Sequence, residues 1–71
     1  MNWDRIQGNW KQLKGKMIEQ WGALTDDDFD VIDGRREQLA EKVQERYGIT
    51  LEAANKQVDE WQGRADDRWF N

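Results

Sequence analysis

Acidic side chains are the most plentiful candidates for chemistry in this 71-residue chain. One cluster lies near the middle of the sequence, at Asp26, Asp27, Asp28, Asp30 and Asp33. Oxygen-rich clusters can bind calcium or magnesium, but an EF-hand loop that begins at Asp28 would need a bidentate Glu where this chain has Leu39. We therefore interpret the cluster as the acidic first turn of a helix, and we predict neither a metal site nor a cofactor.

Other catalytic groups are scarce. The chain has no histidine, cysteine or serine, so the usual pairs of nucleophile and base cannot form. Its two threonines, Thr25 and Thr50, are predicted to cap helices. Nearly all the Asp and Glu residues fall on predicted polar faces, where carboxyl pKa values stay near their ordinary range. We expect a protein that is not an enzyme.

A basic N-terminal segment is the candidate binding surface. The net charge is -4, yet residues 1–24 carry four basic groups against two acidic ones. Nucleic-acid contact is predicted, as an alternative function, for Arg5, Lys11, Lys14 and Lys16. Trp10 and Trp21 are interleaved with these residues and could stack on bases. However, both tryptophans share an apolar stripe, which favours a place in the core over exposure to a ligand.

The spacing of apolar residues predicts a first helix from about Trp3 to Leu24. Its large apolar side chains recur every three or four positions, at Trp3, Ile6, Trp10, Leu13, Met17, Trp21 and Leu24. Gly22 is placed to end this helix in a left-handed cap. Gly8 and Gly15 each cost about 1 kcal/mol relative to alanine inside a helix, so we expect them to permit close approach by another helix or by a ligand. Close internal packing is the favoured interpretation.

Three shorter helices are predicted at about Asp26–Asp33, Arg35–Tyr47 and Leu51–Gln62. Thr25 and Thr50 are placed as N-caps, and Gly48 and Gly63 stand at C-terminal ends. Gly34 is either a stop or a bend between two of these helices. The endings at residues 16–22 and 42–48 also resemble each other, which either reflects recurring cap chemistry or indicates two related α-hairpins.

These elements predict an all-α, four-helix single domain over residues 1–71, with a core of about residues 3–62 and a tail at 63–71. Trp69 and Phe70 suggest that the tail docks, although they could instead bind a protein partner. No apolar run reaches the length of a signal peptide or membrane span. We therefore expect a cytoplasmic monomer whose partners the sequence does not identify.

Three segments carry a family resemblance: G-N-W-K-Q-L-K-G-K from Gly8, E-Q-W-G-A-L-T-D-D-D from Glu19 and E-R-Y-G-I-T from Glu45. In this order they resemble the CsbD-like, or YjbJ-type, family of small bacterial proteins. The resemblance implies a general stress protein with no established catalytic activity, cofactor or binding site. We therefore predict a non-enzymatic stress protein that acts either by binding or, through its abundance, as a hydrophilic protectant. The resemblance also implies two roughly orthogonal α-hairpins, similar to helix-hairpin-helix and SAM-like domains. Many relatives have a basic residue in place of Ile18, and the W-F-N ending extends beyond the common pattern.

Overall fold

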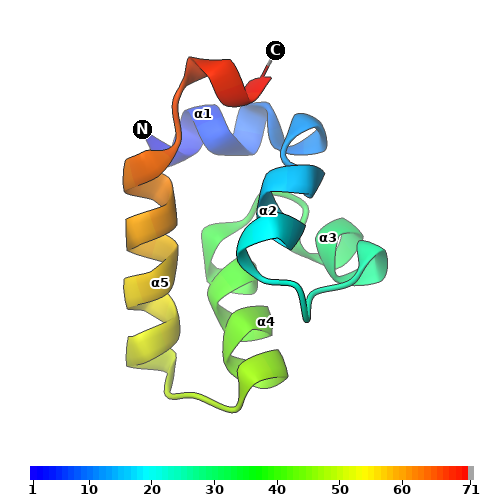
Figure 1. The fold of residues 1–71 in the computed structure, drawn as a ribbon, viewed down its shortest axis with the longest axis vertical. Helices are drawn as coiled ribbons and strands as arrows, with labels where there is room; N and C mark the ends of the chain where they lie inside the picture. The colour runs from blue at the N-terminus through cyan, green and yellow to red at the C-terminus, as the bar shows by residue number, and fades with distance from the viewer. Residues whose placement is uncertain (71) are drawn as a thin grey trace.

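The computed structural model describes residues 1–70, and all of its regular elements are helices (Figure 1). The predicted all-α class is therefore confirmed, with five α-helices where four were predicted. Two short 3₁₀ helices, η1 and η2, complete the described part of the chain. The elements in chain order are α1 (Trp3–Gly8), η1 (Trp10–Gln12), α2 (Lys14–Gln20), α3 (Asp26–Ile32), α4 (Arg36–Tyr47), α5 (Leu51–Arg64) and η2 (Asp67–Phe70).

The single first helix predicted for residues 3–24 is wrong, because this segment is broken into α1, η1 and α2. In a straight helix, Trp3 and Trp21 would be separated by about 27 Å. In the structure their rings lie 6.2 and 5.4 Å from the ring of Trp61, and hence at most about 12 Å from each other. The prediction that the apolar stripe lies in the core is confirmed, since its residues are buried or pack against the core. The chain must bend twice for all of its indoles to reach one point.

Local capping signals predicted most of the other helix ends. The side chain of Thr25 accepts a hydrogen bond from Asp28 N, and Thr50 caps α5 in the same way through Ala53 N. Gly48 ends α4 in the left-handed conformation, at φ 62°. Two predicted ends are wrong: Gly22 is not left-handed, since α2 stops one residue earlier with Trp21 at φ -128°, and α5 continues through Gly63. The two similar sequence endings are thus built differently.

Close approach of backbones occurs at Gly34, and the prediction that it occurs at Gly8 and Gly15 is wrong. A Cβ added at Gly8 or Gly15 would meet no atom within 4 Å beyond its own helix and neighbours. At Gly34 it would lie 3.2 Å from the Cα of Gln7. Gly34 is also left-handed, at φ 78°, and follows the left-handed Asp33. Helix α3 therefore ends before α4 begins, and the tight turn between them packs against α1.

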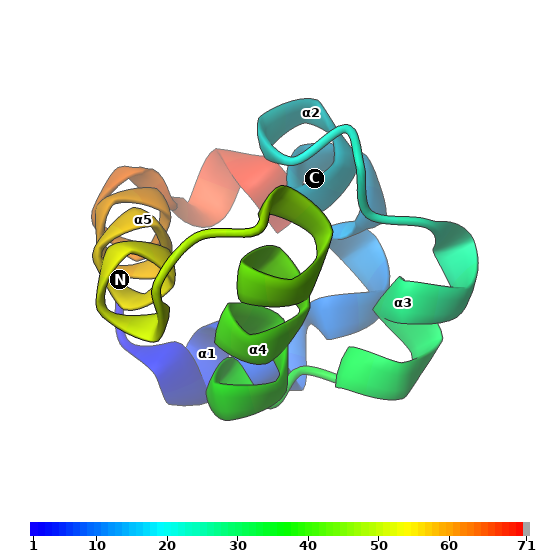
Figure 2. The ribbon, with the colours of Figure 1, turned by 90° about the horizontal axis from the view of Figure 1, so that it is seen from below.

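Helix α4 lies between α5 and α3, as Figure 2 shows from its end. Helices α4 and α5 run in opposite directions, so they form one α-hairpin (Figure 1). The finer likeness to paired orthogonal hairpins and SAM-like domains stays a prediction. Among residues 1–70, no helix combines the length and the apolar character that crossing a bilayer requires.

The core is organised around Trp61 of α5. Its ring lies within 6.3 Å of the rings of the four other tryptophans. We call this group the tryptophan cluster, and it comprises Trp3, Trp10, Trp21, Trp61 and Trp69. Buried apolar residues extend from Ile6 to Ala65, and Trp69 and Phe70 pack against them. The predicted docking of the tail is therefore present, and only Asn71 of that tail lies outside the described residues.

Candidate functional site

The acidic cluster contributes one buried carboxylate, that of Asp28. Its backbone N–H donates to the hydroxyl of Thr25, and its own carboxylate accepts from Thr25 N, which completes a capping box. Arg46 of α4 donates two hydrogen bonds to the same carboxylate, at 3.0 and 2.9 Å. Lys42 lies 3.8 Å away. We call these residues, Thr25, Asp28, Lys42 and Arg46, the Asp28 corner; they join α3 to α4.

The pKa of Asp28 departs most clearly from the ordinary range. Hydrogen bonds from Arg46 lower this pKa to about 2, with the Thr25 backbone N–H also lowering it and burial opposing the shift. The expectation that carboxyl pKa values stay near normal is therefore wrong for Asp28. A carboxylate with so low a pKa and with its oxygens already occupied is a poor general base near neutral pH. The buried carboxylate instead connects α3 to α4 through Arg46 and Lys42.

The basic residues predicted to contact nucleic acid lie in separate surroundings. Arg5 of α1 forms an ion pair with Asp67 of η2. Lys14 of α2 lies 3.9 Å from Asp26, at the start of α3. Lys11 is exposed, and no acidic side chain within residues 1–70 lies in ion-pair contact with it. Nucleic-acid contact through these residues stays a prediction.

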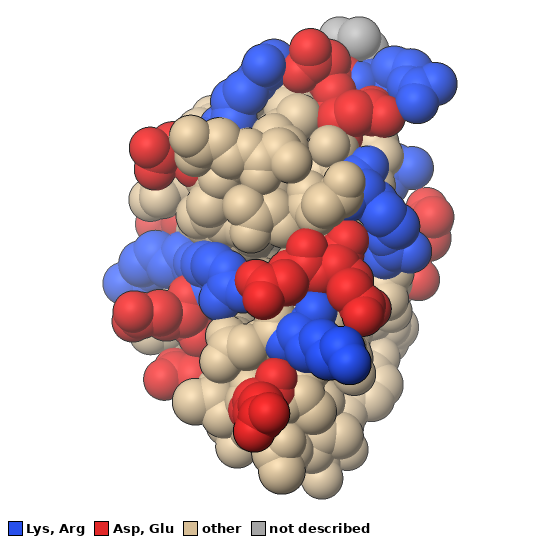
Figure 3. Space-filling view, turned by 90° about the vertical axis from the view of Figure 1, so that its left-hand side faces the viewer, with Lys and Arg blue, Asp and Glu red and all other residues tan. Residues whose placement is uncertain are grey.

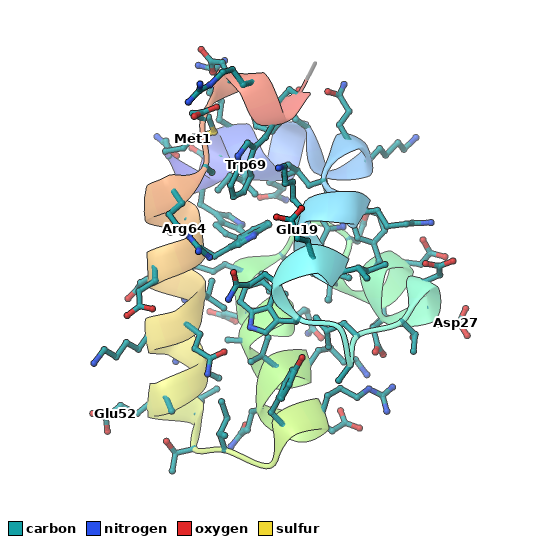
Figure 4. The ribbon with its side chains drawn as sticks, viewed as in Figure 1. Met1, Glu19, Asp27, Glu52, Arg64 and Trp69 are labelled. Carbon is teal, nitrogen blue, oxygen red and sulfur yellow. The ribbon has the colours of Figure 1, made fainter. Side chains whose placement is uncertain are left out.

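The fourth basic residue, Lys16, lies beside a hollow of about 90 Å³ between α2, α5 and η2. We call it the α2–α5 hollow. Figure 4 shows three of its side chains, those of Glu19, Arg64 and Trp69, gathered from these three elements. Its full lining is Lys16, Glu19, Gln20, Trp61, Arg64 and Trp69.

Both cations of the hollow are held in place by side chains that line it. The ammonium of Lys16 lies 5.3 Å from the centre of the Trp69 ring, within the range of a cation–π contact. It also lies 3.9 Å from Glu19. The guanidinium of Arg64 donates to the side-chain carbonyl of Gln20. Arg64 has no carboxylate in ion-pair contact among the described residues, so its charge is not locally neutralised.

The indole N–H groups divide the tryptophan cluster into two kinds. Those of Trp3 and Trp10 donate to the carbonyls of Gly34 and Phe29, and that of Trp21 donates to Gln57. For Trp61 and Trp69, residues 1–70 provide no acceptor. No fully buried side-chain nitrogen or oxygen in the described part lacks a partner. The α2–α5 hollow is the opening that Trp61 lines.

Elsewhere the charges on the surface are mixed. Figure 3, which faces the side of α5, shows Lys and Arg interspersed with Asp and Glu. A second hollow, of about 430 Å³, lies between α4 and α5, and there Arg36 already bonds Asn55 and Asp59. Of these two hollows, only the α2–α5 hollow has a cation without a carboxylate partner among the described residues, Arg64.

Comparison with known proteins places the chain in a family. The family model described as CsbD-like matches residues 4–56. This chain belongs to the CsbD-like family. It is 58% identical over 69 residues to the UPF0337 protein YjbJ of Escherichia coli O6:H1, covering 97% of this chain and 100% of that protein. The YjbJ proteins of Salmonella typhimurium and Escherichia coli K12 are 58% and 55% identical, over 97% of this chain and 99% and 100% of theirs. Membership implies a part in the general stress response.

Sequence reasoning found one cation of the hollow, Lys16, and missed Arg64. Trp61 and Arg64 are three positions apart on α5, the spacing that places two side chains on one helix face. That signal was present. What the sequence could not show is that this face meets Lys16, since the two segments are more than forty residues apart. Trp61, Arg64 and Trp69 also follow residues 4–56, the segment that matches the family model.

Proposed function

We propose that this CsbD-like chain is a non-enzymatic, cytoplasmic stress-response protein that acts by binding other molecules at its surface. The family gives the general stress response, and the structure supports a role without chemistry. The observation that carries the non-enzymatic part of the proposal is the Asp28 corner. The most perturbed carboxylate of the described residues is occupied by Arg46 and a capping box, so its shifted pKa has a structural cause.

The family role is tested by survival of stress. In an Escherichia coli K12 strain that lacks its own YjbJ, expression of this chain should restore survival of stationary-phase or osmotic stress. An unchanged phenotype on deletion and on complementation would overturn the stress role. Purified protein should turn over no member of a metabolite panel, and turnover abolished by one point change would show an enzyme.

Binding is separated from protection by abundance in the same strain. The matched variants are Arg64→Gln, in the α2–α5 hollow, and Lys56→Gln, which removes the same charge from an exposed position on α5. If the protein acts by binding, survival at equal protein level should fall with Arg64→Gln and not with Lys56→Gln. Survival that depends only on the amount of folded protein would instead identify an abundant hydrophilic protectant.

Nucleic-acid contact is the second candidate function, favoured by the place of Lys16 beside the half-buried ring of Trp69. A basic group next to a stacking aromatic is typical of single-strand binding. The test is a titration with single-stranded DNA and RNA at low salt, followed by amide NMR. Binding should weaken steeply as salt rises. An amide spectrum that does not move at low salt would exclude this function.

A further inference from the structure

We propose that the α2–α5 hollow is a binding site for a phosphate-sized oxyanion. The inference rests on the proposed binding role and names its ligand class. Two cations, Lys16 and Arg64, line one opening together with the rings of Trp61 and Trp69. The indole N–H groups of these two tryptophans have no acceptor within residues 1–70. The lining also includes Gln20 and the carboxylate of Glu19. The two cations and the two indole N–H groups are the kinds of group that recognise an anion with several acceptor oxygens.

The size of the hollow limits the ligand. Its volume is about 90 Å³, which corresponds to roughly three water molecules in the liquid. A phosphate group fits this space, whereas a base or sugar attached to it would have to remain outside. The ligand is therefore inorganic phosphate or the phosphate end of a small metabolite, with any remaining part in solvent.

The positions of the cations suit such a ligand because neutral partners hold them. Lys16 lies over the ring of Trp69, and Arg64 is oriented by the amide oxygen of Gln20. Neither of these two contacts neutralises its cation. The charge of Arg64 therefore stays available, and that of Lys16 is paired only with the exposed Glu19. Part of the ordering cost of binding is met before the anion arrives.

Two carboxylates lie near the site and could compete with the oxyanion for its cations. Asp66 is already engaged by Arg68, at 2.9 Å. Glu19 lies 3.9 Å from Lys16, with 73% of its side chain exposed, so it holds Lys16 only weakly. An incoming oxyanion takes the place of Glu19 as the partner of Lys16. Removal of the Glu19 charge should therefore strengthen binding.

The five indole N–H resonances provide the readout. The ¹⁵N-labelled chain is titrated with sodium phosphate at pH 7 and constant ionic strength, with sodium chloride as the control salt. We expect the resonances of Trp61 and Trp69 to shift in a saturable way and those of Trp3 and Trp10, whose N–H groups are bound to backbone carbonyls, to stay in place. Equal shifts with chloride, or shifts spread over all five indoles, would overturn the proposal.

Charge variants test the assignment to this hollow. Arg64→Gln and Lys16→Gln should each weaken phosphate binding about tenfold, the effect of losing one charge-assisted hydrogen bond. Glu19→Gln should tighten it roughly threefold, since a weak surface ion pair no longer competes. Lys11→Gln removes the same charge outside the hollow and should leave the affinity unchanged. An equal loss in Lys11→Gln would show non-specific attraction and overturn the site.

Two further titrations identify the source of the phosphate. Glycerol phosphate that binds more tightly than inorganic phosphate assigns the site to a phosphate ester, and the reverse order assigns it to the free ion. Shifts caused by single-stranded DNA but not by either phosphate would overturn the small-anion site in favour of nucleic acid. Failure of every phosphate titration would remove this ligand, while the survival assay would still decide the stress role.

Discussion

The tryptophan cluster and the Asp28 corner hold the same small domain together by different physics. The cluster joins α1, η1, the C-terminal end of α2, α5 and η2 through aromatic contacts with Trp61, whose exposed fraction is 1%. The corner joins α3 to α4 through one buried carboxylate and two cations. Apolar burial depends little on charge, whereas the ion pair depends on the protonation of Asp28. The tryptophan cluster should therefore contribute most of the free energy of unfolding. The Asp28 corner should determine how that free energy depends on pH.

Substitution of Trp61 should have the largest effect. Truncation of a buried tryptophan costs about 4 kcal/mol, which is comparable to the whole stability expected of a chain this short. We expect Trp61→Ala to abolish the cooperative urea transition and the near-UV dichroism. The matched control is Trp69→Ala, because Trp69 is half-buried and contacts the cluster through Trp61. It should lose about 1 kcal/mol and stay folded. Equal losses of stability in the two variants would show that Trp61 contributes no more to the cluster than Trp69 does.

The Asp28 corner should give the next largest effect. In the native state the pKa of Asp28 is about 2, below the ordinary value of 3.8 for an aspartate side chain. The stabilisation is therefore complete above pH 4 and is lost as the pH falls from about 4 to about 2. One pKa unit corresponds to about 1.4 kcal/mol, so this shift contributes about 2 kcal/mol at neutral pH.

Asp28→Asn tests this assignment. It should cost about 2 kcal/mol in urea unfolding at pH 7, and the difference from the unsubstituted chain should shrink toward zero near pH 2. Asp27→Asn is the control, because Asp27 is exposed in the same helical turn. It should change the stability by less than about 0.5 kcal/mol. If the difference in unfolding free energy between Asp28→Asn and the unsubstituted chain were the same at every pH, the assignment would be refuted.

Gly34 lies next to both regions, since it follows the C-cap of α3 and packs against Gln7 of α1. Gly34→Ala combines a left-handed backbone with a Cβ 3.2 Å from the Cα of Gln7. We expect a loss of about 2 kcal/mol. Gly48→Ala is the matched control, with the same backbone region but open space around the added carbon. It should lose about 1 kcal/mol. Both losses can be measured from the midpoints of denaturant unfolding, provided that the slope of the transition does not change. Equal losses in the two variants would show that the contact with α1 does not contribute.

The sequence predicted those parts of the fold that are decided within a few residues. Thr25, Thr50 and Gly48 act within one helical turn, and all three are placed as predicted. The break in the first helix was not predictable in this way. Its three pieces satisfy the apolar period separately, and only their common distance to Trp61 requires the bends.

The candidate site follows the same division. The acidic turn was read correctly as a helix start, but its partner Arg46 lies eighteen residues further along the chain. In the α2–α5 hollow, Lys16 could be named from local charge and aromatic spacing. Arg64 could not be joined to it, because the meeting of α2 with the end of α5 depends on packing of the whole core.

The smallest expected effect concerns Gly15 in α2, beside the tryptophan cluster. A Cβ added there meets no atom within 4 Å outside its own helix, and the backbone is helical. Gly15→Ala should therefore raise stability by about 1 kcal/mol, because alanine loses less conformational entropy in a helix. For a domain this small, that corresponds to a rise of roughly 4 °C or more in the midpoint of thermal unfolding. A lower midpoint would mean that another surface approaches α2 at Gly15 in solution, and it would restore the close packing predicted from the sequence.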